Sequence, residues 1–140
     1  MANKHIDLIA AGSLISGDGN MAAPAELATA TMGSVTLKIA TVTGTSPLLD
    51  MWLELYDQTA ADYFPVPCDF QLTEPATPKT DVAVATYRKN INGPASVATA
   101  GKHHAVYKHL PAGKYRLRWV CSGTFTAGQG FTVSAGMEVK

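Results

Sequence analysis

The sequence predicts an all-β protein: an antiparallel β-sandwich of jelly-roll or immunoglobulin-like type with an extended N-terminal arm, a closed barrel being the alternative. One observation is the strict alternation after the Pro111-Ala112-Gly113 turn, where Tyr115, Leu117, Trp119 and Cys121 share one face. A second is that about seven or eight short segments alternate in the same way between Gly- and Pro-containing turns. A third is that no long segment has the apolar period of a helix. Short strands at turn-rich spacing are typical of sandwiches.

The N-terminal segment, residues 1–31, is predicted to form a short strand at His5–Ile9 followed by an extended arm. A Gly17-Asp18-Gly19-Asn20 turn interrupts it, and its apolar residues are too few and too scattered for a core of their own. We therefore expect the arm to pack on a neighbouring copy or on another partner, by pairing along a sheet edge. The sandwich domain is expected to span residues 32–140. The arm residues assigned to this interface are Ile6, Leu8, Ile9, Leu14 and Ile15.

Two consecutive segments, residues 35–43 and 49–56, alternate clearly and are separated by a Gly44-Thr45-Ser46-Pro47 turn. This arrangement predicts a β-hairpin. Trp52 and Tyr56 fall on its outward face. They are expected either to lie under the following Pro-rich loop or to anchor an interface.

The second half of the chain predicts further strands at 81–87, 102–109 and 131–139. Two prolines restrict residues 63–70 to an edge strand or a packed loop. The residues predicted to form the core are Tyr115, Leu117, Trp119, Cys121, Leu37, Ile39, Met51, Leu53, Leu55 and Val133.

The charge balance excludes some classes of partner. Eleven Lys and Arg residues match eleven Asp and Glu residues, so the chain lacks the basic excess of a nucleic-acid binder, and no apolar run is long enough to span a membrane. Only 16% of residues are charged, which protects poorly against self-association. Cys68 and Cys121 are expected to be reduced and unlinked, as in a protein made in a cytoplasm.

Catalytic and metal-binding patterns are weak, so neither an enzyme, a metal nor a cofactor is predicted. His103, His104 and His109 cluster in sequence, but neighbouring residues of a strand point to opposite faces, and no acidic or cysteine ligand stands nearby. Asp50 and Glu54 share one strand face and are expected to be solvated. There is no G-x-S-x-G nucleophile motif.

The outward face of the strand after Gly113 carries three cations, Lys114, Arg116 and Arg118. They are expected either to form a solvated sheet face or to dock acidic residues of a neighbouring subunit, where arginine can pair with a carboxylate through two hydrogen bonds.

Three stretches carry a resemblance to a known group: HIDLIAAGSLISGDG, VTLKIATVTGTSPLLDMWLEL and LPAGKYRLRWVCSGTFTAGQGFTVSAGMEVK. Their order is similar to that in small β-sandwich virion proteins of tailed bacteriophages, in which a "GTSPTLDV" turn region precedes a late "RYLRVRWTVSGT…FTFSV" segment. The chain departs from the group at residues 56–60, which replace an acidic-glycine turn, and at residues 80–101, which form an enlarged region.

The resemblance implies a non-enzymatic protein of the virion, a decoration or cement protein on the capsid surface. Its implied partners are the major capsid protein and other copies of itself, in a symmetric oligomer such as a trimer, with neither nucleic acid nor membrane. Another virion role, in the tail or as an adaptor, is also compatible with it. The alternative class is a receptor- or carbohydrate-binding β-sandwich, for which Trp52, Tyr56, Tyr63 and Phe64 could supply aromatic contacts.

Overall fold

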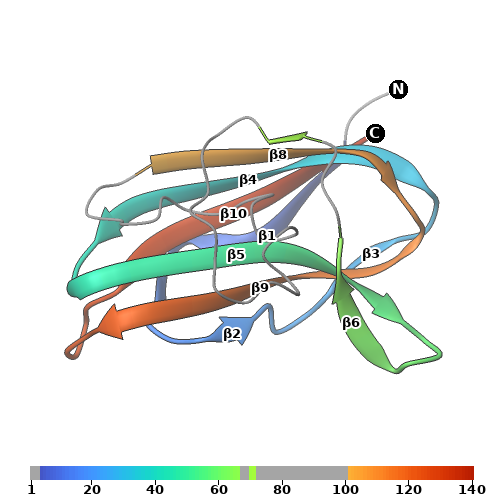
Figure 1. Ribbon diagram of the computed structural model, residues 1–140. Helices are drawn as coiled ribbons and strands as arrows, with labels where there is room; N and C mark the ends of the chain where they lie inside the picture. The colour runs from blue at the N-terminus through green and yellow to red at the C-terminus, as the bar shows by residue number, and fades with distance from the viewer. Residues whose placement is uncertain (1–3, 67–69, 72–100) are drawn as a thin grey trace.

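The alternating segments form ten β-strands in a computed structural model of the chain, which describes residues 4–66, 70–71 and 101–140, without the side chains of 70–71 and 101–104 (Figure 1). The strands are β1 (Lys4–Ile15), β2 (Gly19–Asn20), β3 (Ala25–Leu27), β4 (Thr31–Val42), β5 (Thr45–Asp57), β6 (Asp62–Pro65), β7 (Phe70–Gln71), β8 (Gly101–Leu110), β9 (Gly113–Thr124) and β10 (Phe131–Val139).

The strands pair in a nested order that defines the topology. Sheet A has the order β1-β10-β4-β8-β7, sheet B has the order β2-β9-β5-β6, and β3 also pairs with β9. All pairings are antiparallel. The first strand therefore pairs with the last, β2 with β9, β4 with β8 and β5 with β6, as in a ribbon wound into two layers. This is the strand order of a jelly roll, so the predicted sandwich is confirmed and its type is settled.

The predicted hairpin of residues 35–43 and 49–56 is wrong, although both strands exist. β4 pairs with β10 and β8, whereas β5 pairs with β9 and β6, so the turn between them carries the chain from sheet A to sheet B. A short Gly/Pro turn fits a sheet-to-sheet connection as well as a hairpin. The β8–β9 turn crosses between the sheets in the same way, at the opposite end of the sandwich (Figure 1).

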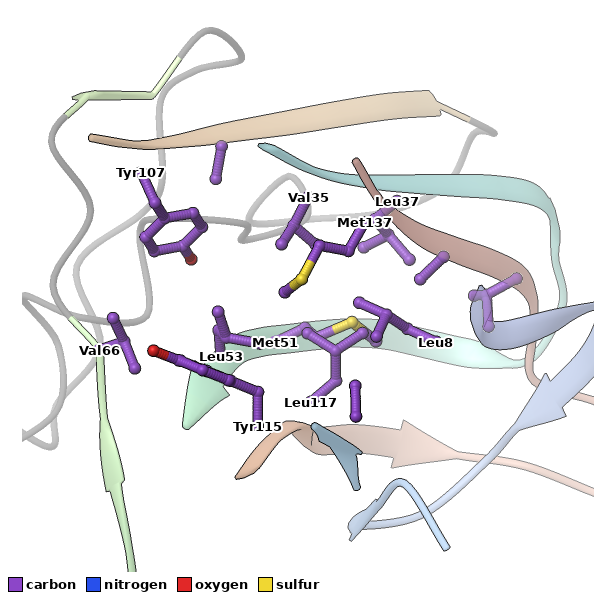
Figure 2. Packing of buried hydrophobic residues seen from close by; sticks show 14 of the residues in the cluster. Leu8, Val35, Leu37, Met51, Leu53, Val66, Tyr107, Tyr115, Leu117 and Met137 are labelled. Carbon is purple, nitrogen blue, oxygen red and sulfur yellow. The ribbon is translucent and has the colours of Figure 1, made fainter. Parts of the chain in front are cut away.

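The core lies between the sheets, where the apolar faces of both layers meet (Figure 2). Seven of the ten predicted core residues are buried, and Leu55, Trp119 and Cys121 are partly buried against the core. Trp119 is less buried than expected. It lies beside the two-residue strand β2, where a Cβ on Gly19 would be 3.0 Å from the indole Nε1. The buried seven are Tyr115, Leu117, Leu37, Ile39, Met51, Leu53 and Val133.

The N-terminal segment is part of the sandwich and not an arm that reaches away from it. β1 pairs along β10, and β2 and β3 pair with β9. Leu8, Ile15, Ala25 and Leu27 are buried in the common core. The segment needs no core of its own because it supplies one strand or more to each sheet, and the structured region therefore begins well before residue 32.

Several predictions fall outside the described residues. They are the strand at 81–87, the enlarged region at 80–101 apart from its last residue, and the state of Cys68. Residues 62–65 form strand β6 at the edge of sheet B, in agreement with the edge position that the prolines predicted.

Candidate functional site

The outer face of sheet B carries a buried polar cluster of Trp52, Glu54 and Arg116. Trp52 and Glu54 lie two residues apart on one side of β5, and Arg116 of β9 is directly opposite Glu54. Glu54 accepts two hydrogen bonds, from Trp52 Nε1 at 3.0 Å and from Arg116 Nε at 2.8 Å. The guanidinium carbon of Arg116 lies 3.9 Å from the centre of the Tyr63 ring. We call Trp52, Glu54, Arg116 and Tyr63 the β5–β9 cluster.

Burial on this face of β5 corrects one expectation and agrees with another. Asp50 and Glu54 were expected to be solvated but are buried, whereas the burial of Trp52 agrees with the alternative that it lies covered and not in an interface. Alternation assigned these residues to the correct face but assumed that this face meets water. Tyr56 is half-buried with its ring edge against Tyr63, at a centroid distance of 5.1 Å.

The cationic stripe is largely paired within the chain. Arg116 is held by Glu54, and Lys114 Nζ lies 3.9 Å from Glu26. Arg118 is half-buried and forms no ion pair with the described residues. The stripe therefore offers fewer free charges to an acidic partner than three consecutive outward cations suggest.

The predicted interface residues of the N-terminal segment differ in their exposure to solvent. Leu8 and Ile15 are buried, and Ile6 and Ile9 pack partly against the core, so these four mainly stabilise the sandwich. Leu14 is 49% exposed and remains available for contact.

Strand β1 is an edge strand with an interrupted edge. Between Ile9 and Ser13, β1 uses four residue steps where β10 uses two, so Ala10 to Gly12 bulge out of the sheet. Ser13 Oγ donates to the carbonyl of Ala10 at 2.6 Å and closes the bulge. Bulges of this kind disfavour edge-to-edge pairing. The bulge therefore restricts the expected pairing with a neighbour along this edge to the parts of β1 on either side of residues 10–12.

An exposed polar cluster lies on the outer face of sheet A. The His5 imidazole on β1 contacts Glu138 of β10 through Nδ1 and lies 2.8 Å from Asp7 through Nε2. Hydrogen bonds to Asp7 and to Glu138 raise the pKa of His5 above its usual value of 6.5. Gly136 makes room for the ring, since a Cβ there would lie 2.9 Å from His5 Cε1. We call His5, Asp7 and Glu138 the His5 cluster.

A cavity of about 440 Å³ opens at the end of the sandwich that carries the β5–β6 and β8–β9 turns (right in Figure 1). Leu55, Pro65, Val66 and Pro111 supply apolar walls. Phe64 also lines it, and its side chain is on the interior side of sheet B because it pairs with Leu55, yet it is 51% exposed. The cavity is thus a solvent-accessible opening at one end of the core.

Polar groups lie beside this apolar surface. Tyr56, Asp57 and His109 line the same cavity. Asp57 Oδ1 accepts a hydrogen bond from the Ala60 amide at 2.8 Å, which fixes the β5–β6 turn. The sequence analysis named Tyr56 and Phe64 among the aromatic residues of a possible binding module. It did not associate Asp57 and His109 with them, because the topology that brings the β5–β6 and β8–β9 turns together cannot be read from the sequence.

The remaining titratable candidates do not assemble a metal site. His103 and His104 lie on β8, paired with Leu37 and Thr36, and their side chains are outside the described part. Among the described residues, no three His, Cys, Asp or Glu side chains are grouped to hold a metal ion. Cys121 is a free, half-buried thiol, and its burial, with the nearby charge of Asp18, raises its pKa to about 11.

Within the described ranges, no helix is long and apolar enough to cross a membrane. No protein-family model matches the chain, and no curated protein matches its sequence.

Proposed function

We propose that this chain is a non-enzymatic structural protein of a tailed-bacteriophage particle, a decoration protein that binds the head shell through the major capsid protein and stabilises it. The observation that carries the proposal is the resemblance in residues 35–55 and 110–140 to small β-sandwich virion proteins. In the fold these stretches contribute β4, β5, β9 and β10, which are interior strands of both sheets. Jelly rolls recur in viral capsid proteins, which is an analogy at the level of the fold.

Because residues 4–27 are folded into the sandwich, we look for the contact surface among the exposed side chains of the described residues. Leu14 is the best candidate, because it is a large apolar side chain left 49% exposed at the end opposite the 440 Å³ cavity. It lies beside the β9–β10 turn, where a Cβ on Gly130 would be 3.2 Å from Leu14 Cδ1. A short loop with an apolar residue beside it is a suitable shape for a docking contact.

The test is co-sedimentation of the purified protein with heads of the encoding phage from which the protein is absent. We expect saturable binding at a fixed number of copies per head and a higher temperature of head disruption. Leu14→Glu should weaken binding at least about tenfold, equivalent to 1.4 kcal/mol. The matched control is Met32→Glu, at the other large apolar side chain with 49% exposure. Absence of saturable binding to heads would refute the proposal.

A further inference from the structure

We propose that the cavity at the β5–β6 end binds a neutral pyranose sugar, with Phe64 as its stacking platform and with Asp57 and His109 holding its hydroxyl groups. This inference goes beyond the proposed structural role, because it concerns a different end of the sandwich from Leu14 and needs no capsid partner.

Phe64 is the first element of this site. Its ring is on the interior side of sheet B, where neighbouring Leu53 is fully buried, but it is left half-exposed beyond the end of the core. An exposed aromatic face attracts the C–H groups of one pyranose face, because those hydrogens carry partial positive charge and the ring face is negative. Leu55 and Pro111 add apolar surface around it.

The charges around the cavity select a neutral, hydroxylated ligand. Its described lining contains one carboxylate, Asp57, and neither lysine nor arginine, so an anion would find no cationic partner among the described residues. Asp57 Oδ1 is used by the turn amide of Ala60, and Oδ2 makes no hydrogen bond within the described part of the chain. Asp57 can therefore accept from sugar hydroxyls, while His109 can both donate and accept.

The walls of the cavity are fixed before any ligand arrives. The Tyr115 hydroxyl donates to the Pro111 carbonyl at 2.6 Å, which holds the β8–β9 turn, and the ring of Tyr115 is fully buried. On the other wall, the Val66 amide donates to the Leu53 carbonyl at 2.9 Å. A preformed site reduces the entropy lost on binding.

The size of the cavity also fits a small ligand. Its volume of about 440 Å³ lies within the range of about 300–1,000 Å³ that is usual for small-molecule sites, and such sites combine apolar walls with a few polar groups. Because the site is open and offers one stacking ring, we expect dissociation constants in the range of about 0.1–10 mM for single sugars.

The test is an NMR titration of the full-length, ¹⁵N-labelled protein with methyl glycosides of glucose, galactose, mannose and N-acetylglucosamine. We expect saturable amide shifts confined to residues 55–57, 64–66 and 109–113 for at least one sugar. Phe64→Ala should raise its dissociation constant at least about tenfold, and Asp57→Asn about three- to tenfold. Leu14→Ala is the matched control, since Leu14 is equally exposed but far from the cavity, and it should change nothing.

Any one of three titration results would overturn the inference: no saturable shift with any of the four glycosides, shifts that Phe64→Ala leaves unaltered, or tighter binding of a tetramethylammonium probe than of every sugar. If Phe64→Ala disturbs folding, Phe64→Leu keeps the apolar volume and removes the ring, and the same loss is expected. Binding to phage heads distinguishes this inference from the proposed function. The Phe64→Ala variant should bind heads as the wild type does, whereas loss of head binding in this variant would assign the cavity to protein docking and contradict sugar binding.

Discussion

The His5 cluster and the β5–β9 cluster are built alike and differ in burial. Each joins two paired strands through a charged side chain with two partners: His5 with Asp7 and Glu138, and Glu54 with Trp52 and Arg116. The side chains of the His5 cluster are all more than 45% exposed, whereas those of Glu54 and Arg116 are 9% and 22% exposed.

This difference in burial decides which cluster is required for stability and which contributes an amount that varies with pH and salt. In water, an ion pair is screened and contributes little to the free energy of folding. The contribution of the His5 cluster also depends on whether the histidine is protonated. Away from water, a carboxylate that loses its partners keeps its desolvation cost, so both partners become necessary. We therefore expect the β5–β9 cluster to fix the register of β5 against β9. We expect the His5 cluster to stabilise the pairing of β1 with β10 by an amount that depends on pH.

The largest effect is expected for Glu54→Ala. The variant leaves the Arg116 guanidinium and the Trp52 indole without their acceptor, which should lower the free energy of unfolding by about 3–5 kcal/mol. The measurement is urea denaturation of Glu54→Ala and of Glu138→Ala, which removes the matched carboxylate of the exposed His5 cluster. Glu138→Ala should cause a small fraction of that loss, and equal losses would show that burial is not the deciding factor.

Trp52→Phe should have the next largest effect. It retains most of the ring but removes the indole N–H that donates to Glu54 Oε2, and the lost hydrogen bond to a buried charged group should cost about 1.5–3 kcal/mol. The same urea experiment measures it. Trp119→Phe is the control, because Trp119 is only partly buried and outside the cluster. A loss no larger than that of Trp119→Phe would contradict a role for the indole N–H.

The pH dependence of β1 should be smaller and should come from His5. Because folding raises the pKa of His5 above 6.5, its stabilising contribution is complete below pH 6.5 and is lost as the pH rises through the folded-state pKa. The difference in thermal midpoint between the wild type and His5→Gln should therefore be largest near pH 6 and shrink at about pH 9. Added salt should reduce it as well. A difference that is constant over this range would contradict a stabilising role of the His5 cluster.

The smallest effect is expected for Gly136→Ala. A Cβ at this position would lie 2.9 Å from His5 Cε1, and the exposed imidazole can rotate away at little cost. The pKa of His5, followed by NMR of its ring protons, should fall towards 6.5 while the thermal midpoint changes little. A His5 pKa that stays raised would show that the ring does not need the space above Gly136. Ser134→Ala, further along the same strand, is the control.

The sequence predicted the layers better than their connections. Period-two alternation placed Leu37, Met51 and Leu117 in the core, because each lies on a strand with one apolar face. It could not distinguish a hairpin from a crossing between sheets after Val42, since both need only a short turn. It underestimated the N-terminal segment because the bulges of β1 disturb the alternation that would have revealed a strand.

The candidate sites were less predictable than the fold. Tyr56 and Phe64 were recognisable as aromatic residues near a turn, but His109 joins them only through the jelly-roll topology. The ion pair of Glu54 with Arg116 was hidden for a different reason: the two residues are 62 positions apart in the chain, and their pairing depends on the register of β5 with β9.

The proposed function is tested most directly by a cryo-electron microscopy map of the intact phage particle that encodes this chain. We expect density for the jelly roll on the outer surface of the head, with the end that carries Leu14 and the β9–β10 turn facing the capsid protein and the Phe64 cavity open to solvent. Density in the tail, or native heads without any density for the protein, would contradict the decoration role.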